Sequence, residues 1–401
     1  MIRKYYWVAA LTPLEAFLAP VVVVFYLDYV GINFATYSLF IACLFILNAL
    51  LEVPLGAVSD FIGRRKALLL GNLFVGFGLL SIVLFPGKEV LYSASVFISS
   101  GGTLASGNLN SIGYEAFRDD EMEKEEFSRF LAKISTLSIS AMAVAALLGG
   151  IVASINIALP MFIDIFLIMI KTCIGFFFFA VLWPDEEKKI QKPEKLLLSR
   201  VELNEVIGIL KTGSFAVAML LGVTTFVLLR TSLNFYQPML SLKGISETQL
   251  GILFCTGILA SAMISRVLLK HLQVDLNLRA AILIFLGLTS ASGIFFWLDI
   301  GNSSLIVAGF FLHQLLRIFV PAVTMSEMHR AIPDGHARRT TIISVTFFIQ
   351  AIVAALVVAA TGFLADHVFS YNLTMGALHL STLILIGIIA VLGSTSRPAN
   401  A

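Results

Sequence analysis

Twelve apolar runs, each long enough to cross a lipid bilayer as a helix, occupy most of this sequence. A spanning helix needs about 20 mainly apolar residues. Lipid offers the backbone no hydrogen-bond partners, so each run is predicted to be an α-helix; the runs are too long and too uniform for barrel strands. The sequence therefore predicts an all-α integral membrane protein with spans at 5–27, 34–55, 67–86, 90–114, 130–155, 157–183, 212–236, 247–270, 279–299, 303–329, 340–365 and 370–393.

Composition agrees with this prediction. Only 13% of the residues are charged and 58% are hydrophobic, whereas a soluble domain has roughly 25% charged and 45–50% apolar residues. The net charge of +2 is too small to indicate nucleic acid as a partner. The three cysteines lie far apart in apolar runs, with no metal-site or disulfide spacing, so they are interpreted as packing residues.

The first run could be mistaken for a signal peptide, because Arg3 and Lys4 precede it. However, it shows no small-residue cleavage site, and Glu15 and two prolines interrupt it. A first membrane helix fits these features better than a cleaved signal.

The longest polar segment lies between Trp183 and Thr212 and contains two prolines and mixed charge. It predicts a cytoplasmic linker, residues 184–211, part of it an amphipathic helix on the membrane surface. The linker divides the chain into an N-terminal half of six helices, residues 1–183, and a C-terminal half of six helices, residues 212–401.

Basic residues orient the chain. Of the 27 lysines and arginines, only Lys88 and Lys243 fall in the predicted outer loops, and four lie within spans. The others flank the spans on one side, which the positive-inside rule identifies as cytoplasmic. The sequence therefore predicts cytoplasmic N- and C-termini. Short loops and the lack of targeting extensions favour the bacterial cytoplasmic (inner) membrane.

An internal repeat supports two related halves. Glu115 and Arg118 form a Glu-x-x-Arg pattern at the end of the fourth span, and Glu327 and Arg330 repeat it at the end of the tenth. Equivalent positions on equivalent helices are expected when two parallel six-helix repeats build a transporter.

The loop after the second span carries the most specific motif. Gly56-x-x-x-Asp60-x-x-Gly63-Arg64-Arg65-Lys66 resembles the signature of the major facilitator superfamily between helices two and three. The resemblance covers the whole chain and implies twelve helices in two pseudo-symmetric halves, with transport by alternating access, of the efflux type. In the second half, the matching loop keeps only Lys270 and Arg279 from this pattern.

The resemblance also assigns a cytoplasmic gate. Gly56 would allow close helix approach, Gly63 a tight turn, and Asp60 a cap on a neighbouring helix. The arginines would pair with acidic groups at the ends of helices four and ten and latch the halves in the outward-open state. Alternatively, the arginines only set the topology. The predicted gate comprises Gly56, Asp60, Gly63, Arg64, Arg65, Glu115, Arg118, Glu327 and Arg330.

Ionisable side chains inside spans are costly and therefore indicate function. Glu15, Arg230 and Arg317 fall on helices one, seven and ten, which line the central cavity in the family that the chain resembles. Polar neighbours on these helices and on helix four complete the predicted substrate and proton cavity: Glu15, Asn108, Tyr114, Arg230, Tyr236, Gln237, His313, Gln314 and Arg317. Asp164 and Lys171 share one face of helix six, outside the cavity, where a structural role is favoured.

Two arginines against one glutamate favour an anionic or zwitterionic substrate, because a guanidinium binds carboxylate or phosphate in a bidentate manner. The leading hypothesis is a proton-coupled exporter of such a metabolite, siderophore-like, with Glu15 or His313 carrying the proton. A multidrug/proton antiporter for lipophilic cations is one alternative. It is weakened because helix four lacks a basic residue and helix five lacks a Gly-Pro pair, features that are usual in that branch of the family.

An importer or uniporter on the same fold is a second alternative, and a membrane-embedded enzyme a third. No metal cluster, Gly-x-Ser-x-Gly motif or nucleotide-binding pattern supports an enzyme or a bound cofactor. An ion gradient is therefore the expected energy source. The expected partners are a small-molecule substrate, protons and lipid. The protein is expected to be a monomer.

Overall fold

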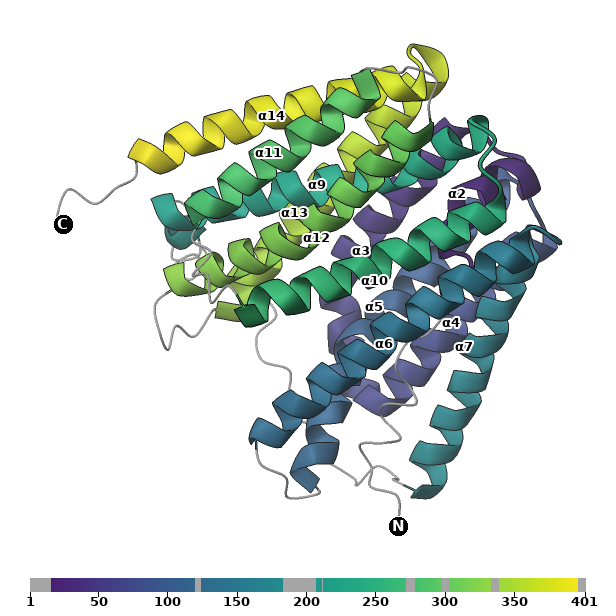
Figure 1. The fold of residues 1–401 in the computed structure, drawn as a ribbon. Helices are drawn as coiled ribbons and strands as arrows, with labels where there is room; N and C mark the ends of the chain where they lie inside the picture. Colours follow the sequence, from purple (N-terminus) through teal and green to yellow (C-terminus); the bar gives the residue numbers. More distant parts are fainter. Residues whose placement is uncertain are drawn as a thin grey trace. The chain divides into compact units, whose positions relative to one another are not determined.

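A computed structural model describes residues 16–119, 124–182, 207–210, 212–271, 278–297, 303–332 and 339–395, which form helices and contain no strand (Figure 1). The helices before the polar segment are η1 Ala19–Val21, α2 Val22–Val24, η2 Phe25–Tyr29, α3 Phe34–Ile62, α4 Arg64–Leu84, α5 Lys88–Asp119, α6 Lys124–Ala153, α7 Leu159–Phe177 and η3 Phe178–Leu182. Those after it are α9 Gly213–Leu242, α10 Glu247–His271, α11 Leu278–Trp297, α12 Ser303–Ala331, α13 Arg339–His367 and α14 Tyr371–Thr395.

Each predicted span coincides with helical structure. Within the described ranges, 8 helices are long and apolar enough to cross a membrane, and shorter apolar stretches lie in Ala19–Tyr29, Ala280–Phe296 and Ser303–Arg317. Helix α5 is equally long, but its serine, glycine and asparagine side chains make it less apolar. The all-α membrane fold predicted from the sequence is confirmed.

The first predicted span differs from the structure. Residues 16–18 are not helical, and the described helix starts at Ala19 as a 3-10 turn. Pro20 occupies the first turn, where its missing N–H and fixed φ are tolerated. The chain then passes through α2 into the π-helical turn η2. The predicted uninterrupted helix 5–27 is therefore wrong in its described part, and residues 1–15 lie outside the described residues.

The chain forms two compact units. The first contains Met1–Ile32, Cys43–Glu194 and Ser246–Leu259, and the second contains Asn33–Ala42, Lys195–Ile245 and Ala260–Ala401. The start of α3 thus belongs to the second unit, and the start of α10 belongs to the first. The predicted division at the linker 184–211, of which the structure describes only residues 207–210, stays a prediction.

In the first unit, α4 packs against α5 and α7. Small residues set the distance between α4 and α5: a Cβ added to Gly71 would lie 2.7 Å from the carbonyl oxygen of Gly101. Glycine at such positions lets two membrane helices approach through their backbones. The same principle joins α6 to the start of α10, where a Cβ on Gly251 would lie 2.9 Å from the Cα of Gly150.

In the second unit, α9 packs against α12, α13 and α14, and α11 packs against α12 and α14. The start of α3 joins this unit through specific contacts. The Phe34 ring meets the rings of Phe235 and Tyr371 edge-on at 4.8 and 5.0 Å. The Asp366 carboxylate accepts a hydrogen bond of 2.7 Å from the backbone N–H of Ala35.

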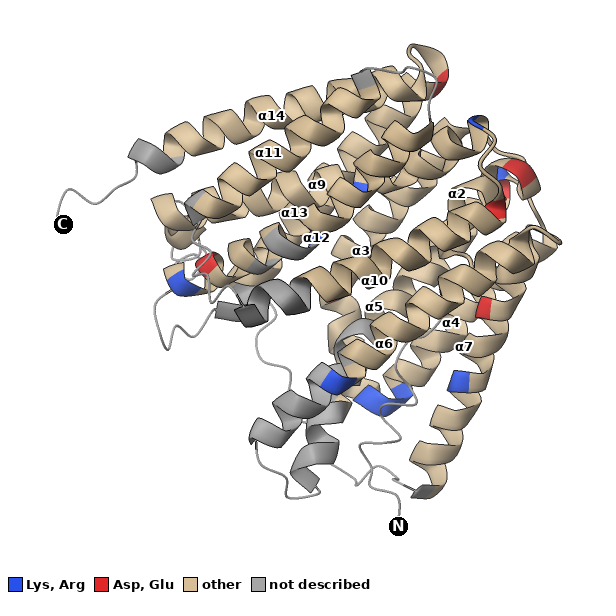
Figure 2. Cartoon of the chain, in the orientation of Figure 1, with Lys and Arg blue, Asp and Glu red and all other residues tan. Residues whose placement is uncertain are grey.

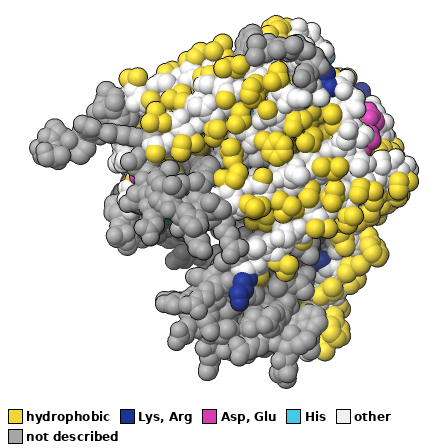
Figure 3. Space-filling model, in the orientation of Figure 1, with side chains coloured by type: hydrophobic (Ala, Val, Ile, Leu, Met, Phe, Trp, Pro, Cys, Tyr) yellow, Lys and Arg dark blue, Asp and Glu magenta, His cyan; other side chains and the backbone are white. Residues whose placement is uncertain are grey.

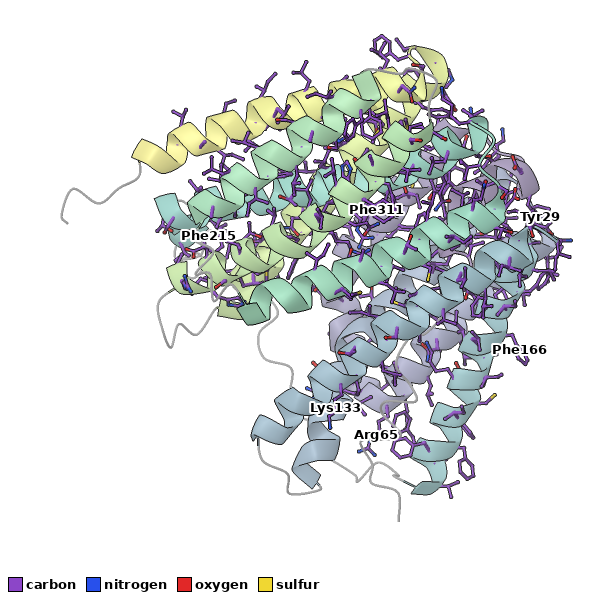
Figure 4. The ribbon with its side chains drawn as sticks, viewed as in Figure 1. Tyr29, Arg65, Lys133, Phe166, Phe215 and Phe311 are labelled. Atoms are coloured by element: carbon purple, nitrogen blue, oxygen red, sulfur yellow. The ribbon has the colours of Figure 1, made fainter. Side chains whose placement is uncertain are left out.

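The described surface suits lipid. Large apolar side chains such as Phe61, Phe166 and Met263 are exposed, and Figure 4 shows Phe166 projecting away from α7. Figure 3 shows hydrophobic side chains spread over the visible face, with few charged ones among them. In Figure 2 most described charges lie at or near helix ends. This distribution is typical of helices whose middle parts lie in hydrocarbon.

Candidate functional site

Arg230 on α9 and Arg317 on α12 are two cations on neighbouring helices of the second unit. Both residues have exposed surface, but protein surrounds most of the Arg230 guanidinium, and the positive charge of Arg317 acts on it. The Arg230 guanidinium also lies 5.4 Å from the centre of the Phe226 ring. Among the described residues, no carboxylate lies within ion-pair distance of either arginine. The pair therefore presents uncompensated positive charge on accessible side chains.

Tyr236, His313 and His379 form a buried polar cluster in the same unit, with exposed fractions of 1%, 4% and 0%. The Tyr236 hydroxyl is hydrogen-bonded to Nδ1 of His313. Nε2 of His313 lies 3.3 Å from Nε2 of His379, and the two rings are nearly perpendicular at 89°. Sequence reasoning identified the first two residues but missed His379. A lone histidine in the apolar run of α14 was its only signal.

Backbone carbonyls and aromatic rings complete the surroundings of the cluster. The Gly309 carbonyl lies 3.1 Å from Nδ1 of His313, and the Met375 carbonyl lies 2.8 Å from Nδ1 of His379. The Phe296 ring from α11 packs 5.0 Å from the His379 ring. Gly309 leaves room for this packing, since a Cβ there would lie 3.2 Å from the Phe296 ring. The cluster is thus closely packed from α9, α11, α12 and α14.

The amides predicted for the cavity are largely buried. Gln237 is 1% exposed and Gln314 is 8% exposed. Nearby on α9, Asn234 accepts a hydrogen bond of 3.3 Å from the hydroxyl of Tyr37, which belongs to the start of α3. The hydrogen bond between Tyr37 and Asn234 therefore helps to hold the start of α3 against α9 within the second unit.

Asn108, predicted as a cavity residue, has a structural environment. It is 7% exposed, and its side-chain oxygen accepts a hydrogen bond of 2.9 Å from the Ser59 hydroxyl. Its amide donates to the Leu104 carbonyl at 2.6 Å. These bonds tie α3 to α5 in the first unit and occupy the side chain. Glu15 and the side chain of Tyr114, also predicted for the cavity, lie outside the described residues.

The non-helical segment at 16–18 is held by Asp164 of α7. The backbone N–H groups of Phe17 and Leu18 donate to its two carboxylate oxygens at 3.1 and 2.9 Å. The carboxylate thereby satisfies donors that a continuous helix would have paired internally. Gly149 of α6 faces the same backbone, because a Cβ there would overlap the Phe17 carbonyl. This geometry gives Asp164 the structural role that was predicted for it.

The gate residues of the first unit surround the turn between α3 and α4. Gly63 has φ +92°, which glycine adopts without a steric penalty, so the predicted tight turn is found there. Arg65 is buried, with its guanidinium 5.9 Å from the centre of the Phe179 ring, and Figure 4 shows it at the end of the unit where α4 begins. Arg64 and Asp60 are exposed. A Cβ on Gly56 would meet no described atom within 4 Å, so the predicted close helix approach is not found among these residues.

In the second unit, Glu327 pairs with Arg330 one helical turn away, at 2.9 Å. This is the Glu-x-x-Arg motif itself forming a local ion pair, with the arginine side chain 64% exposed. The side chains of Glu115 and Arg118, the matching pair, lie outside the described residues. Pairing of Arg64 or Arg65 with these glutamates across the two units stays a prediction.

Comparisons with known proteins identify the family of this chain. A family model described as Major Facilitator Superfamily matches residues 6–358. No curated protein sequence matches the chain. Similar solved structures include a mutant of nucleoside transporter NupG, with a TM-score of 0.72 at 11% identity, covering 98% of this chain and 100% of that one.

Two further solved structures are similar over nearly their whole length. A POT family transporter in complex with 5-aminolevulinic acid has a TM-score of 0.72 at 14% identity, covering 98% of this chain and 96% of that one. The POT family transporter PepTSo has a TM-score of 0.71 at 10% identity, covering 99% and 98%. At these identities the likeness shows the fold. Together with the family match it establishes that the chain is a membrane transporter that belongs to the major facilitator superfamily.

Proposed function

We propose that this transporter moves a small anionic or zwitterionic organic solute across the membrane by alternating access, coupled to protons. The observation that carries the proposal is the pair Arg230 and Arg317. Both are accessible, they lie on neighbouring helices, and the described residues place no carboxylate against them. A charged side chain within a membrane-spanning helix costs free energy unless an opposite charge compensates it. A bound anion would provide that opposite charge.

Arginine suits this role better than lysine. Its planar guanidinium presents a fork of N–H donors that matches a carboxylate or phosphate. Two such forks would hold a solute with two anionic groups, or one anionic group between them. The POT family structure named for its complex with 5-aminolevulinic acid, a zwitterion, indicates that the fold accommodates such a solute.

A thermal-shift screen of the detergent-purified full chain tests the proposal. Citrate, phosphate and 5-aminolevulinic acid are compared with the lipophilic cation tetraphenylphosphonium. A ligand present at 100 times its dissociation constant stabilises the folded protein by about 2.7 kcal/mol. We expect an anion or zwitterion to raise the melting temperature, and Arg317→Ala and Arg230→Ala to abolish that rise.

Arg330→Ala is the matched control, because it removes an exposed arginine whose partner is already the local Glu327. It should leave the ligand-induced shift unchanged. Stabilisation by the cation alone would overturn the proposal and favour the multidrug/proton antiporter. In that case Glu15, which lies outside the described residues, becomes the residue to replace with glutamine.

Export remains a prediction from the resemblance and a siderophore-like solute a prediction from the two arginines, with an importer on the same fold as the second candidate. Reconstituted vesicles separate the two directions through the orientation of the proton gradient that drives accumulation. Cytoplasmic N- and C-termini, a bacterial cytoplasmic membrane and a monomeric state are proposed on the basis of the lysine and arginine distribution and the short loops. The cytoplasmic latch formed by Arg64, Arg65 and the two Glu-x-x-Arg motifs is proposed on the basis of the loop motif and the family that it resembles.

A further inference from the structure

The buried cluster of Tyr236, His313 and His379 has a hydrogen-bond order that we assign from its distances. A backbone carbonyl can only accept, and the Met375 carbonyl lies closer to Nδ1 of His379, at 2.8 Å, than the Gly309 carbonyl lies to Nδ1 of His313, at 3.1 Å, so the proton is assigned to Nδ1 of His379. In a neutral ring this leaves Nε2 of His379 as an acceptor. Nε2 of His313, 3.3 Å away, must then carry the proton of the bond between the rings.

This assignment makes Nδ1 of neutral His313 an acceptor, and the Tyr236 hydroxyl donates to it. The Gly309 carbonyl, however, lies only 3.1 Å from the same nitrogen. The Gly309 carbonyl already accepts the backbone N–H of His313 within α12, but a carbonyl oxygen can accept a second hydrogen bond, and an unprotonated ring nitrogen has no proton to give it. The neutral cluster therefore leaves one interaction of His313 unused.

One added proton would complete the hydrogen bond between Nδ1 of His313 and the Gly309 carbonyl. A proton bound at Nδ1 of His313 gives an N–H that donates to Gly309, while Nε2–H continues to donate to His379. The Tyr236 hydroxyl then loses its acceptor, and its oxygen becomes available to accept. A second added proton would have to bind at Nε2 of His379, where it would face the N–H of His313. The cluster thus has room for one added proton and excludes a second.

The surroundings contain little that would neutralise this charge. Tyr236 is the titratable group that α9 presents, α11 contributes the Phe296 ring, and α14 contributes His379 itself. Arg317 lies one helical turn along α12 from His313. The described residues place no carboxylate against either imidazole. A proton bound here would be held by neutral hydrogen-bond acceptors.

We propose that Tyr236, His313 and His379 form the proton site of the transporter, which binds one proton at Nδ1 of His313. His379 stabilises the imidazolium by accepting the hydrogen bond from Nε2 of His313. When the imidazolium forms, the Tyr236 hydroxyl loses its hydrogen bond to Nδ1 of His313, which joins α9 to α12. The inference deepens the proposed function, since it supplies the residues for proton coupling. It adds His379, which the sequence did not single out.

Nitrogen-15 NMR of the full chain, labelled at histidine and held in lipid nanodiscs without solute, tests the site. The spectrum distinguishes the two neutral tautomers from imidazolium for each ring, and Gln variants assign the signals. As the pH is lowered from about 8 to about 4, past the range in which histidine ordinarily titrates, we expect His313 alone of the pair to become imidazolium. Two neutral rings throughout, or two imidazolium rings, would overturn the proposal.

Variants separate stabilisation of the proton from packing. His379→Leu removes the acceptor, so the His313 midpoint should move to lower pH by about one to two units. His379→Gln keeps an acceptor oxygen and should restore part of the shift. His367→Gln is the matched control, because Nδ1 of His367 also faces a carbonyl four residues back, at 3.1 Å, but on an exposed side chain.

An unchanged midpoint in His379→Leu would show that the pair is only packed together. The measurement needs no solute, so failure of the anion proposal does not affect it. Conversely, a protonated His313 in a protein that binds none of the anions would leave the proton site standing and remove the proposed substrate class.

Discussion

The backbone N–H of Leu18 donates a hydrogen bond of 2.9 Å to the carboxylate of Asp164. The bond joins residues that are far apart in the chain and satisfies a backbone group just before the described helix begins at Ala19. Backbone groups in lipid need protein partners wherever they are not paired within a helix. Asp164 therefore supplies the acceptors that the non-helical residues Phe17 and Leu18 need.

Replacing Asp164 should destabilise the protein. Asp164→Ala leaves the N–H groups of Phe17 and Leu18 without their acceptors in a buried site, at a cost of about 1–3 kcal/mol for each unsatisfied group. Asp164→Asn keeps an acceptor oxygen but adds N–H donors, so its cost should be smaller. The melting temperature in detergent, in the absence of solute, measures both effects.

Asp366 provides the control. It also accepts a backbone N–H, that of Ala35 at 2.7 Å, but at an exposed position where water can replace it. Asp366→Asn should change the melting temperature little. Equal effects of Asp164→Asn and Asp366→Asn would show that the non-helical segment at 16–18 does not depend on the buried carboxylate.

Gly149→Ala tests the other side of the same non-helical segment. The new Cβ would overlap the carbonyl of Phe17 and lie 2.8 Å from its Cα. A backbone neighbour cannot turn aside as a side chain can, so α6 and the segment at 16–18 must separate. Overpacking of this kind typically costs about 1–3 kcal/mol, and we expect a lower melting temperature.

Gly102→Ala is the matched control, since a Cβ there would meet no described atom within 4 Å. In a helix interior this exchange should be neutral or stabilising by up to about 1 kcal/mol. If Gly149→Ala behaved in the same way, the contact between Gly149 and Phe17 would have no energetic importance.

The contrast between Arg64 and Arg65 offers a third prediction. Arg65 is buried with its guanidinium over the Phe179 ring, whereas Arg64 is exposed. Arg65→Ala loses a cation–π contact of about 0.5–2 kcal/mol together with the packing of its stem. It should lower the melting temperature more than Arg64→Ala does. The reverse order would indicate that the motif stabilises the protein mainly through Arg64.

The sequence was informative where a physical constraint acts on a whole segment. Length and hydrophobicity located the spans from 34–55 onward, because a bilayer demands about 20 apolar residues whatever their neighbours are. Gly63 was predicted correctly for a similar reason, since its turn requires a positive φ that other residues avoid. These features depend on local chemistry alone.

Features that depend on neighbours were not predictable in the same way. The non-helical segment at 16–18 needs the distant acceptor Asp164, and the pattern of helix one does not show it. His379 stands alone in an apolar run, and only the packing of α14 brings it to His313. Asn108 was placed in the cavity because its helix is a cavity helix; its hydrogen bond with Ser59 was not foreseen, and its place in a cavity stays a prediction. The hydrophobic pattern locates the helices, but it does not show which side chains of neighbouring helices meet.

The last prediction concerns how protons and anions affect each other. A proton on His313 adds a positive charge one helical turn from Arg317, which is a spacing of about 5–6 Å between Cβ atoms. With an anion roughly 10 Å away and an effective dielectric constant near 20, the attraction is about 1.7 kcal/mol. An anion should therefore bind about tenfold or more tightly once the cluster is protonated, and by linkage it should raise proton affinity equally. The affinity of the protein for sulfate is measured from about pH 8 to pH 5, because the charge of sulfate is constant over this range.

We expect tighter sulfate binding at low pH, an affinity independent of pH in His313→Gln, and the same pH dependence as the unmodified protein in His367→Gln. Such cooperation favours movement of proton and anion in the same direction. If sulfate instead bound more weakly as the pH fell, proton and anion would compete, as export by proton exchange requires.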